Sequence, residues 1–384
     1  MSAICQHPGG DGLHLVLLSE QAKLFLGTQR AAVDGDLLRR NQITKIVCVG
    51  TPRFHPNEFE YLEVPVLDIP SENLLVRFDA CASFIETGMR SGRGVLVNCV
   101  FAQSRSPTVV VAYLMKQKGV ALADAMEMIR TAQPTININP GFQAQLMLYR
   151  DMNCRLTASD GLPALLMAHA TFRWFLFACQ VRKYGECLPL DTENWEKRGR
   201  DDTQTMAGGM QATTRSYRCK ACRASLFYGR NVIDHLHPVV LAANETTYES
   251  IARYGDGISW SAARDAASAG STVGPMNSTA RKAKRGSLRN GRSESDNNGS
   301  ASRSPTTSDT CTSVFTEVLP WIGMVDASGR LSGAESLRKI TCPGRNGMGC
   351  GSKIGAWNLQ GTTCSCGRTV KPSVQFTLSR IEVA

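Results

Sequence analysis

The chain lacks an uninterrupted apolar run long enough to cross a membrane. Its most apolar stretch, Leu162 to Val181, contains His169 and Arg173 and therefore favours a packed or amphipathic helix. Residues 1–13 lack the basic segment and apolar core of a secretory signal. These absences predict a chain without a membrane partner, located in the cytoplasm and nucleus.

The absence of a secretory signal also changes the meaning of the 14 cysteines. In a reducing compartment, clustered cysteines bind metal more often than they form disulfides. We therefore expect the cysteine-rich C-terminal part of the chain to hold metal ions.

Residues 1–160 carry no net formal charge, although the whole chain carries a formal charge of +10. Residues 1–160 contain 15 Lys and Arg and 15 Asp and Glu, whereas residues 161–384 contain 28 and 18. The basic excess therefore lies in the second part. It favours a polyanionic partner such as RNA, although a solvated basic surface is the plainer interpretation.

The most informative motif follows the apolar segment Val95 to Val97. A strand there would deliver Cys99 to a short loop, and a helix would begin near Arg105. The helix dipole and the guanidinium stabilise a thiolate, and loop amides can surround a phosphate. The predicted phosphate-binding loop consists of Val100, Phe101, Ala102, Gln103, Ser104 and Arg105. The alternative is a buried cysteine that ends a core strand.

The first 160 residues alternate between strand and helix patterns. Strands are predicted at 23–26, 45–49, 61–66 and 95–97, and helices at 31–40, 76–89, 105–118, 122–131 and 142–156. This alternation predicts an α/β fold with a twisted central, largely parallel sheet flanked by helices. The Cys99 loop lies at the carboxyl end of a central strand, where such sheets bind ligands.

The pattern changes beyond residue 160. We predict an α/β domain over 1–158, a helix and linker over 159–216, and a small β-rich zinc-binding domain over 217–384. Residues 257–310 are poor in large apolar side chains and predict a disordered insert. Its basic cluster, Arg281 to Arg285, fits a nuclear-import signal or an RNA contact as well as a solvated linker.

Seven cysteines beyond residue 200 occur in settings typical of metal ligands. With one histidine, they are the right number for two closed, four-coordinate Zn²⁺ sites of a structural kind. The predicted ligands are Cys219, Cys222, His235, Cys311, Cys342, Cys350, Cys364 and Cys366. His237 is an alternative to His235, and the spacing leaves sequential and interleaved pairings open.

The first domain resembles the dual-specificity branch of the cysteine-dependent protein phosphatases from about Lys23 to Leu156. The resemblance is carried by Leu26-Gly27, Val66-Leu67-Asp68, the Cys99 loop, Ala112-Tyr113-Leu114-Met115 and Asn139-Pro140-Gly141-Phe142. It implies a sheet flanked by helices and hydrolysis of phosphorylated tyrosine, serine or threonine in proteins, without a metal ion.

The resemblance also implies a role for each catalytic residue. Cys99 attacks phosphorus and forms a phosphocysteine, while Arg105 and the loop amides hold the phosphate oxygens. Asp68 protonates the leaving oxygen, with Glu72 as the second candidate for this acid. Ser106 donates a hydrogen bond to the departing thiolate.

Three residues depart from the family pattern and predict reduced activity. Asn98 replaces the usual histidine before the cysteine, so no cationic ring is available there. Ala102 replaces a loop glycine, and its Cβ limits the backbone. Phe101 places an aromatic ring where a smaller residue is usual, which predicts a narrower mouth or a stacking surface.

The two domains together resemble the Yvh-type dual-specificity phosphatases. The C-terminal resemblance is carried by Arg218 to Phe227, Ile233 to His235, Cys342-Pro343, Ile354 to Trp357, Cys364 to Arg368 and Pro372 to Phe376. It implies His235 as the zinc-binding histidine. It also implies a partner, the pre-60S ribosomal particle with its ribosomal RNA, and a role in late maturation of the large subunit. Cys350 departs from the family because the second knuckle is stretched by an insertion.

Two other functions compete with this prediction. One is a catalytically weak or inactive scaffold whose zinc domain alone serves ribosome assembly. The other is a free phosphatase whose zinc domain only recruits substrate.

Overall fold

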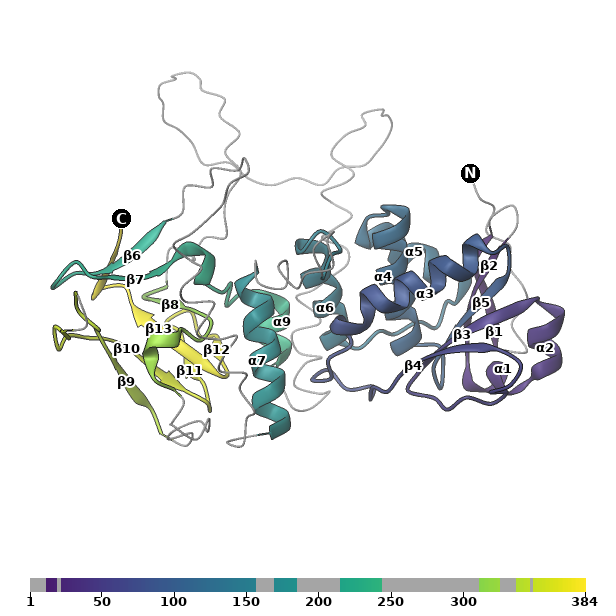
Figure 1. Ribbon diagram of the computed structural model, residues 1–384, viewed down its shortest axis with the longest axis horizontal. Helices are drawn as coiled ribbons and strands as arrows, with labels where there is room; N and C mark the ends of the chain where they lie inside the picture. The colour runs from purple at the N-terminus through teal and green to yellow at the C-terminus, as the bar shows by residue number, and fades with distance from the viewer. Residues whose placement is uncertain are drawn as a thin grey trace, which may run out of the picture.

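The computed structural model describes residues 12–18, 22–156, 169–184, 215–243, 311–324, 336–345 and 348–384. An α/β domain and a β-rich domain lie at opposite ends of the molecule, with helices α6, α7 and α9 between them (Figure 1). The predicted helix and linker at 159–216 are described only at 169–184 and 215–216, and the predicted insert at 257–310 lies outside the described residues. The three predicted domain boundaries stay predictions.

The α/β domain is built on a five-stranded sheet with the order β1-β2-β5-β3-β4. Its strands are Leu13–Leu18 (β1), Lys23–Gly27 (β2), Ile43–Val49 (β3), Glu60–Val64 (β4) and Gly94–Asn98 (β5). Neighbouring strands are parallel except for β1 and β2. The predicted largely parallel sheet is therefore confirmed.

Helices cover both faces of this sheet. They are Gln29–Val33 (α1), Gly35–Arg40 (α2), Phe78–Arg90 (α3, after the 3-10 turn Leu75–Arg77, η1), Arg105–Lys118 (α4), Leu122–Ala132 (α5) and Pro140–Asp151 (α6). Alternate residues of β5 face opposite sides: Val95 and Val97 pack in the core beneath α3 to α6, and Leu96 packs with α1 and α2. Burial on both faces explains why the central strands β2, β5 and β3 are largely apolar, whereas the edge strand β4 carries Glu60 and Glu63.

Some predicted elements differ from the structure. The helix predicted at 31–40 is split because the Asp34 side chain accepts a hydrogen bond from Leu37 N and starts α2 anew. The last helix ends at Asp151, not 156, because Asn153 and Cys154 adopt left-handed backbone conformations. Strand β1 was not predicted.

The C-terminal domain consists of small antiparallel sheets, which confirms the β-rich prediction. One sheet has the order β8-β13-β10-β9, from Ser313–Phe315, Ser373–Thr377, Lys353–Asn358 and Arg338–Thr341. A second joins Ile381–Val383 (β14), Ser216–Cys219 (β6) and Ser225–Tyr228 (β7), and a third pairs Thr362–Thr363 (β11) with Thr369–Val370 (β12). Short 3-10 turns lie at Gly229–Asn231 and Pro320–Ile322.

Helices α7 (Ala170–Tyr184) and α9 (Pro238–Ala243) join the two domains. The Trp174 indole donates a hydrogen bond to the Pro372 carbonyl over 2.9 Å. Helix α9 packs on α6, and apolar side chains of α7 and α9 share one continuous buried core with the α/β domain. No helix among the described residues is long and apolar enough to span a membrane.

Candidate functional site

The Cys99 loop forms the floor of a cavity of about 220 Å³. Strand β5 ends at Asn98, and Cys99 N donates a hydrogen bond to the Gly27 carbonyl on the neighbouring strand. Helix α4 begins at Arg105, and the Ser104 side chain does not cap its first turn. The Cys99 side chain is buried and lines the cavity. The sequence motif therefore folds as a strand, a loop and a helix around one cavity.

The Ser106 hydroxyl lies 3.1 Å from the Cys99 sulfur and donates a hydrogen bond to it. Both side chains are buried, so this hydrogen bond is shielded from water. A hydroxyl in this position can stabilise a thiolate or a departing sulfur.

Two backbone carbonyls accept hydrogen bonds from the Arg105 guanidinium and fix its position. Its Nη1 donates to Gly50 O and Val66 O, each over 3.3 Å. Its Nε has no hydrogen-bond partner among the described residues and lies 3.7 Å from the Asp68 carboxylate. The guanidinium is therefore oriented, with donors left for an anion in the cavity.

Gly50 provides the space for this guanidinium. It adopts a left-handed φ of 70°, and a Cβ there would lie 2.1 Å from Arg105 Nη1. Gly50 was not predicted as a site residue, although it follows strand β3 at the carboxyl edge of the sheet, where ligand-binding loops gather.

We expect Gly50→Ala to lower kcat/KM for an aryl phosphate about 100-fold, because the new Cβ displaces Arg105. Steady-state kinetics of p-nitrophenyl phosphate hydrolysis measure this change in kcat/KM. Gly119→Ala is the matched control, since Gly119 is also left-handed, with φ 63°, but has open space around it. Equal activity losses in the two variants would contradict the assigned role of Gly50.

Asp68 lines the same cavity as Cys99. One carboxylate oxygen accepts hydrogen bonds from the Ser104 hydroxyl over 2.6 Å and the Asn139 amide over 2.8 Å. Asn139 also caps α6, because its side-chain oxygen accepts from Phe142 N. Glu72, the second candidate for the acid, is not among the residues that line the cavity. The geometry therefore favours Asp68 over Glu72 as the acid that protonates the leaving oxygen.

The three departures from the family pattern have different structural consequences. Asn98 donates to the Thr51 hydroxyl over 2.9 Å, and its buried carbonyl has no partner among the described residues. Ala102 is buried with a left-handed φ of 55°, a conformation that costs a non-glycine residue about 1 kcal/mol. Phe101 is exposed at the cavity mouth.

The eight predicted ligands form two separate clusters. Cys219, Cys222, Cys342 and Cys350 make the first cluster, and His235, Cys311, Cys364 and Cys366 make the second. The ligands of the two clusters thus interleave along the chain, a point that the spacing left open. His237 belongs to neither cluster and instead contacts the Asp151 carboxylate over 3.2 Å.

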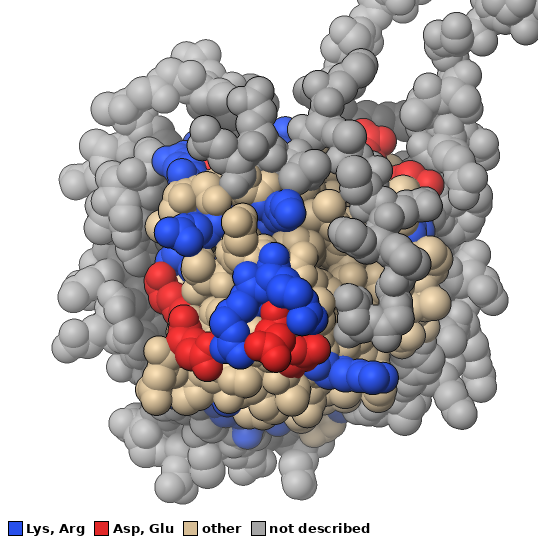
Figure 2. All heavy atoms as spheres, turned by 90° about the vertical axis from the view of Figure 1, so that its right-hand side faces the viewer, with Lys and Arg blue, Asp and Glu red and all other residues tan. Residues whose placement is uncertain are grey.

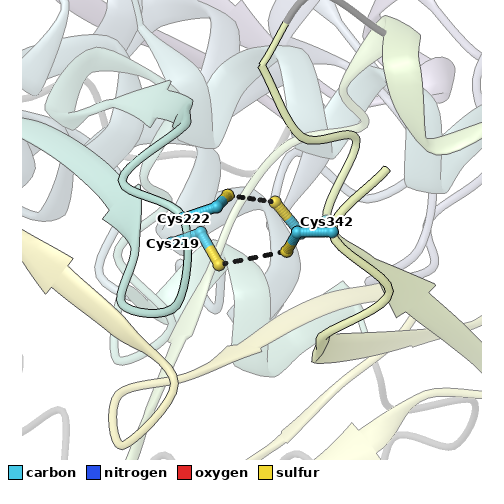
Figure 3. Close-up of side chains that lie close together, drawn as sticks. Cys219, Cys222 and Cys342 are labelled. Carbon is cyan, nitrogen blue, oxygen red and sulfur yellow. Dashed lines mark hydrogen bonds between the residues drawn. The ribbon is translucent and has the colours of Figure 1, made fainter. Parts of the chain in front are cut away.

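Both clusters have the dimensions of a tetrahedral metal site. In the first, the Cys219–Cys350 and Cys222–Cys342 sulfur pairs are 3.8 and 3.5 Å apart, and the sulfur atoms of Cys219, Cys222 and Cys342 point toward one another (Figure 3). In the second, His235 Nε2 lies 3.5 Å from the sulfur atoms of both Cys311 and Cys366. Tetrahedral zinc with ordinary bond lengths separates two sulfur ligands by about 3.8 Å, and sulfur from nitrogen by about 3.5 Å. The residues therefore fit a closed, structural metal ion in each cluster.

Comparisons with known proteins cover both domains. The family "Dual specificity phosphatase, catalytic domain" matches residues 24–152. Dual specificity protein phosphatase 12 of Rattus norvegicus is 29% identical over 372 residues, covering 94% of this chain and 86% of the relative. The Homo sapiens protein of the same name is 27% identical over 380 residues, covering 95% and 88%.

Solved structures match a little over a third of the chain. A crystal structure of human DUSP28 is 34% identical, with a TM-score of 0.34, and covers 38% of this chain and 96% of its own. The Yvh1 phosphatase domain from Chaetomium thermophilum is 24% identical, with a TM-score of 0.35, and covers 38% and 99%. Dual specificity protein phosphatase 1B of Arabidopsis thaliana is 42% identical over 135 residues, covering 34% of this chain and 81% of the relative. From this relative and the family match at 24–152, the chain belongs to the dual-specificity phosphatase family, and it is similar to phosphatase 12 along nearly its whole length.

Proposed function

We propose that the chain is a dual-specificity protein phosphatase that acts through a phosphocysteine at Cys99. The observation that carries the proposal is one cavity that brings together Cys99, Asp68 and the loop ahead of Arg105. The Cys99 thiolate attacks phosphorus, and Asp68 protonates the leaving oxygen. Arg105 and the loop amides stabilise the charge on the transferring phosphoryl group. Water then cleaves the phosphocysteine, and Ser106 stabilises the departing sulfur.

We further propose that the C-terminal domain binds two Zn²⁺ ions and assists late large-subunit maturation on pre-60S particles. Its described residues carry twelve Lys and Arg against three Asp and Glu. The basic residues are Arg215, Arg218, Lys220, Arg223, Arg230, Arg338, Lys339, Arg345, Lys353, Arg368, Lys371 and Arg380, and the acidic residues are Asp234, Glu317 and Glu382. Such an excess supports binding to RNA phosphates.

The α/β domain offers a different surface. On its face at the α1–α2 end, basic and acidic side chains lie against one another and form no continuous basic patch (Figure 2). Arg39, for example, pairs with both Asp36 and Glu58. The charge distribution therefore supports the C-terminal domain as the part that contacts RNA.

A matched pair of cysteine variants separates the two proposed activities. We expect Cys99→Ser to abolish hydrolysis of p-nitrophenyl phosphate but to retain co-sedimentation with large-subunit precursors. We expect Cys219→Ser to lose co-sedimentation, because it removes a ligand of the first cluster. Retained hydrolysis in Cys99→Ser would contradict the enzymatic proposal, and wild-type protein absent from the precursors would contradict the ribosomal one.

The alternative of a weak or inactive scaffold is favoured by one observation, the unpartnered carbonyl of buried Asn98. We expect Asn98→His to raise kcat for p-nitrophenyl phosphate several-fold, because an imidazolium beside the loop stabilises the thiolate. An unchanged rate would show that Asn98 does not limit turnover.

A further inference from the structure

One exposed aromatic side chain lines the Cys99 cavity, and two exposed apolar residues are the sequence neighbours of Asp68. Phe101 is 69% exposed and lines the cavity, while Leu67 and Ile69, which precede and follow Asp68, are 63% and 44% exposed. Cys99 lines the same cavity but is only 1% exposed. A phosphate bound beside Cys99 therefore leaves the group that carries it close to the exposed Phe101 ring.

The polar groups of the cavity point to the same kind of recognition. Besides Cys99 and Phe101, the cavity is lined by Asp68, Gln103, Ser104, Asn137 and Asn139. Among the residues that the structure describes, this lining holds no lysine or arginine that could pair with acidic residues of a substrate. The side chain of Asp68 is partly engaged by Ser104 and Asn139. Apolar contact is therefore the main means of selecting the group next to the phosphate.

We propose that Phe101 determines specificity for aryl phosphates, namely phosphotyrosine in proteins, over phosphoserine and phosphothreonine. The exposed ring of Phe101 contacts the ring of phosphotyrosine, an interaction that the short alkyl stems of phosphoserine and phosphothreonine cannot make. Stacked or edge-to-face aromatic pairs favour binding by about 3–10-fold. Leu67 and Ile69 extend the apolar contact to residues beside the phosphotyrosine. This inference rests on the proposed phosphatase function.

Two peptides that differ only in carrying phosphotyrosine or phosphothreonine test the proposal. We expect Phe101→Ala to lower kcat/KM for the phosphotyrosine peptide about 3–10-fold and to change that for the phosphothreonine peptide less than about twofold. Phe101→Leu keeps an apolar side chain without the ring and is expected to behave like Phe101→Ala. Leu337→Ala is the control, because Leu337 is also exposed, at 58%, but lies in the C-terminal domain.

A binding measurement keeps this test separate from the test of the proposed function. Calorimetric titration of Cys99→Ser, with and without Phe101→Ala, measures peptide affinity without turnover. Loss of the preference for phosphotyrosine in the double variant supports the inference. Equal effects on the two peptides, or none, would overturn it. If the wild-type chain hydrolyses neither peptide, the phosphatase proposal fails, and the affinities alone decide the role of Phe101.

Discussion

Removal of metal from the His235–Cys311–Cys364–Cys366 cluster is expected to unfold the C-terminal domain. Structural zinc contributes about 10–16 kcal/mol to the folding of small domains, which exceeds the entire stability of many domains. The cluster joins segments far apart in the chain, since its ligands precede α9, precede β8 and follow β11. In the other cluster, burial raises the pKa of the Cys342 thiol. Without a bound metal ion, the charged thiolate form of Cys342 is therefore disfavoured. We therefore expect Cys311→Ser, or chelation, to abolish the native circular dichroism of this domain.

Loss of metal from this cluster is also expected to destabilise the phosphatase domain. Cys311 and Cys364 belong to the continuous core shared with the α/β domain, whereas Cys219 and Cys342 belong to a separate apolar cluster. Helix α9 follows His235 directly and packs on α6. Cys311→Ser should therefore lower the melting temperature of the phosphatase domain more than Cys219→Ser does.

A hydrogen bond between His237 and the Asp151 carboxylate also links the two domains. Burial raises the pKa of Asp151, but hydrogen bonds from His237 and Arg150 outweigh that effect and hold the pKa below its ordinary value. Asp151 is the last residue of α6, and Asn139, which caps the other end of α6, holds Asp68. Helix α6 thus connects the second cluster to the cavity.

Differential scanning calorimetry of Cys311→Ser, Cys219→Ser and Cys154→Ser provides the measurement. Cys154 is half-buried and outside both clusters, so its replacement controls for loss of a thiol alone. Elemental analysis of the wild-type chain should find two zinc ions per chain. Absence of stoichiometric metal, or equal melting temperatures in all variants, would contradict this account.

Replacement of Arg105 by lysine is expected to lower kcat/KM for p-nitrophenyl phosphate about 1000-fold. Lysine keeps the charge but lacks the planar fork that holds two phosphate oxygens. It also lacks the Nη1 donor that tethers the side chain to Gly50 O and Val66 O. The loss therefore combines weaker phosphate binding with a misplaced cation.

Arg90→Lys is the matched control for this change. Arg90 lies on the surface of α3 and donates a hydrogen bond to Glu86 over 2.9 Å. Surface ion pairs of this kind contribute about 0.5 kcal/mol, so activity should be unchanged. Activity in Arg105→Lys within tenfold of wild type would contradict the role of Arg105.

Much of the fold could be predicted from the sequence, because buried parallel strands leave short apolar runs between helical patterns. Strands β2, β3 and β5 lie close to their predicted ranges. Strand β1 was missed because it pairs antiparallel at the edge of the sheet and follows a polar segment. The break at Asp34 depends on a single capping hydrogen bond, which periodicity does not reveal.

Some features of the site could likewise be predicted from the sequence, and others could not. The Cys99, Arg105 and Ser106 arrangement is local, so its spacing predicts its geometry. The positions of Gly50 and Asn139 depend on contacts between distant segments, namely the approach of a Cβ to Arg105 and a hydrogen bond to Asp68. The metal clusters show both cases: the ligand types were evident from the sequence, but their interleaved pairing depends on how the sheets fold.

In the proposed mechanism, Cys99 carries the phosphoryl group during turnover. Acid quenching of the chain during hydrolysis of an aryl phosphate, followed by peptide mass spectrometry, tests it directly. We predict one added phosphoryl group on the peptide that contains Cys99 and none in Cys99→Ser. Turnover that labels a different residue, or no residue at all, would contradict the claim.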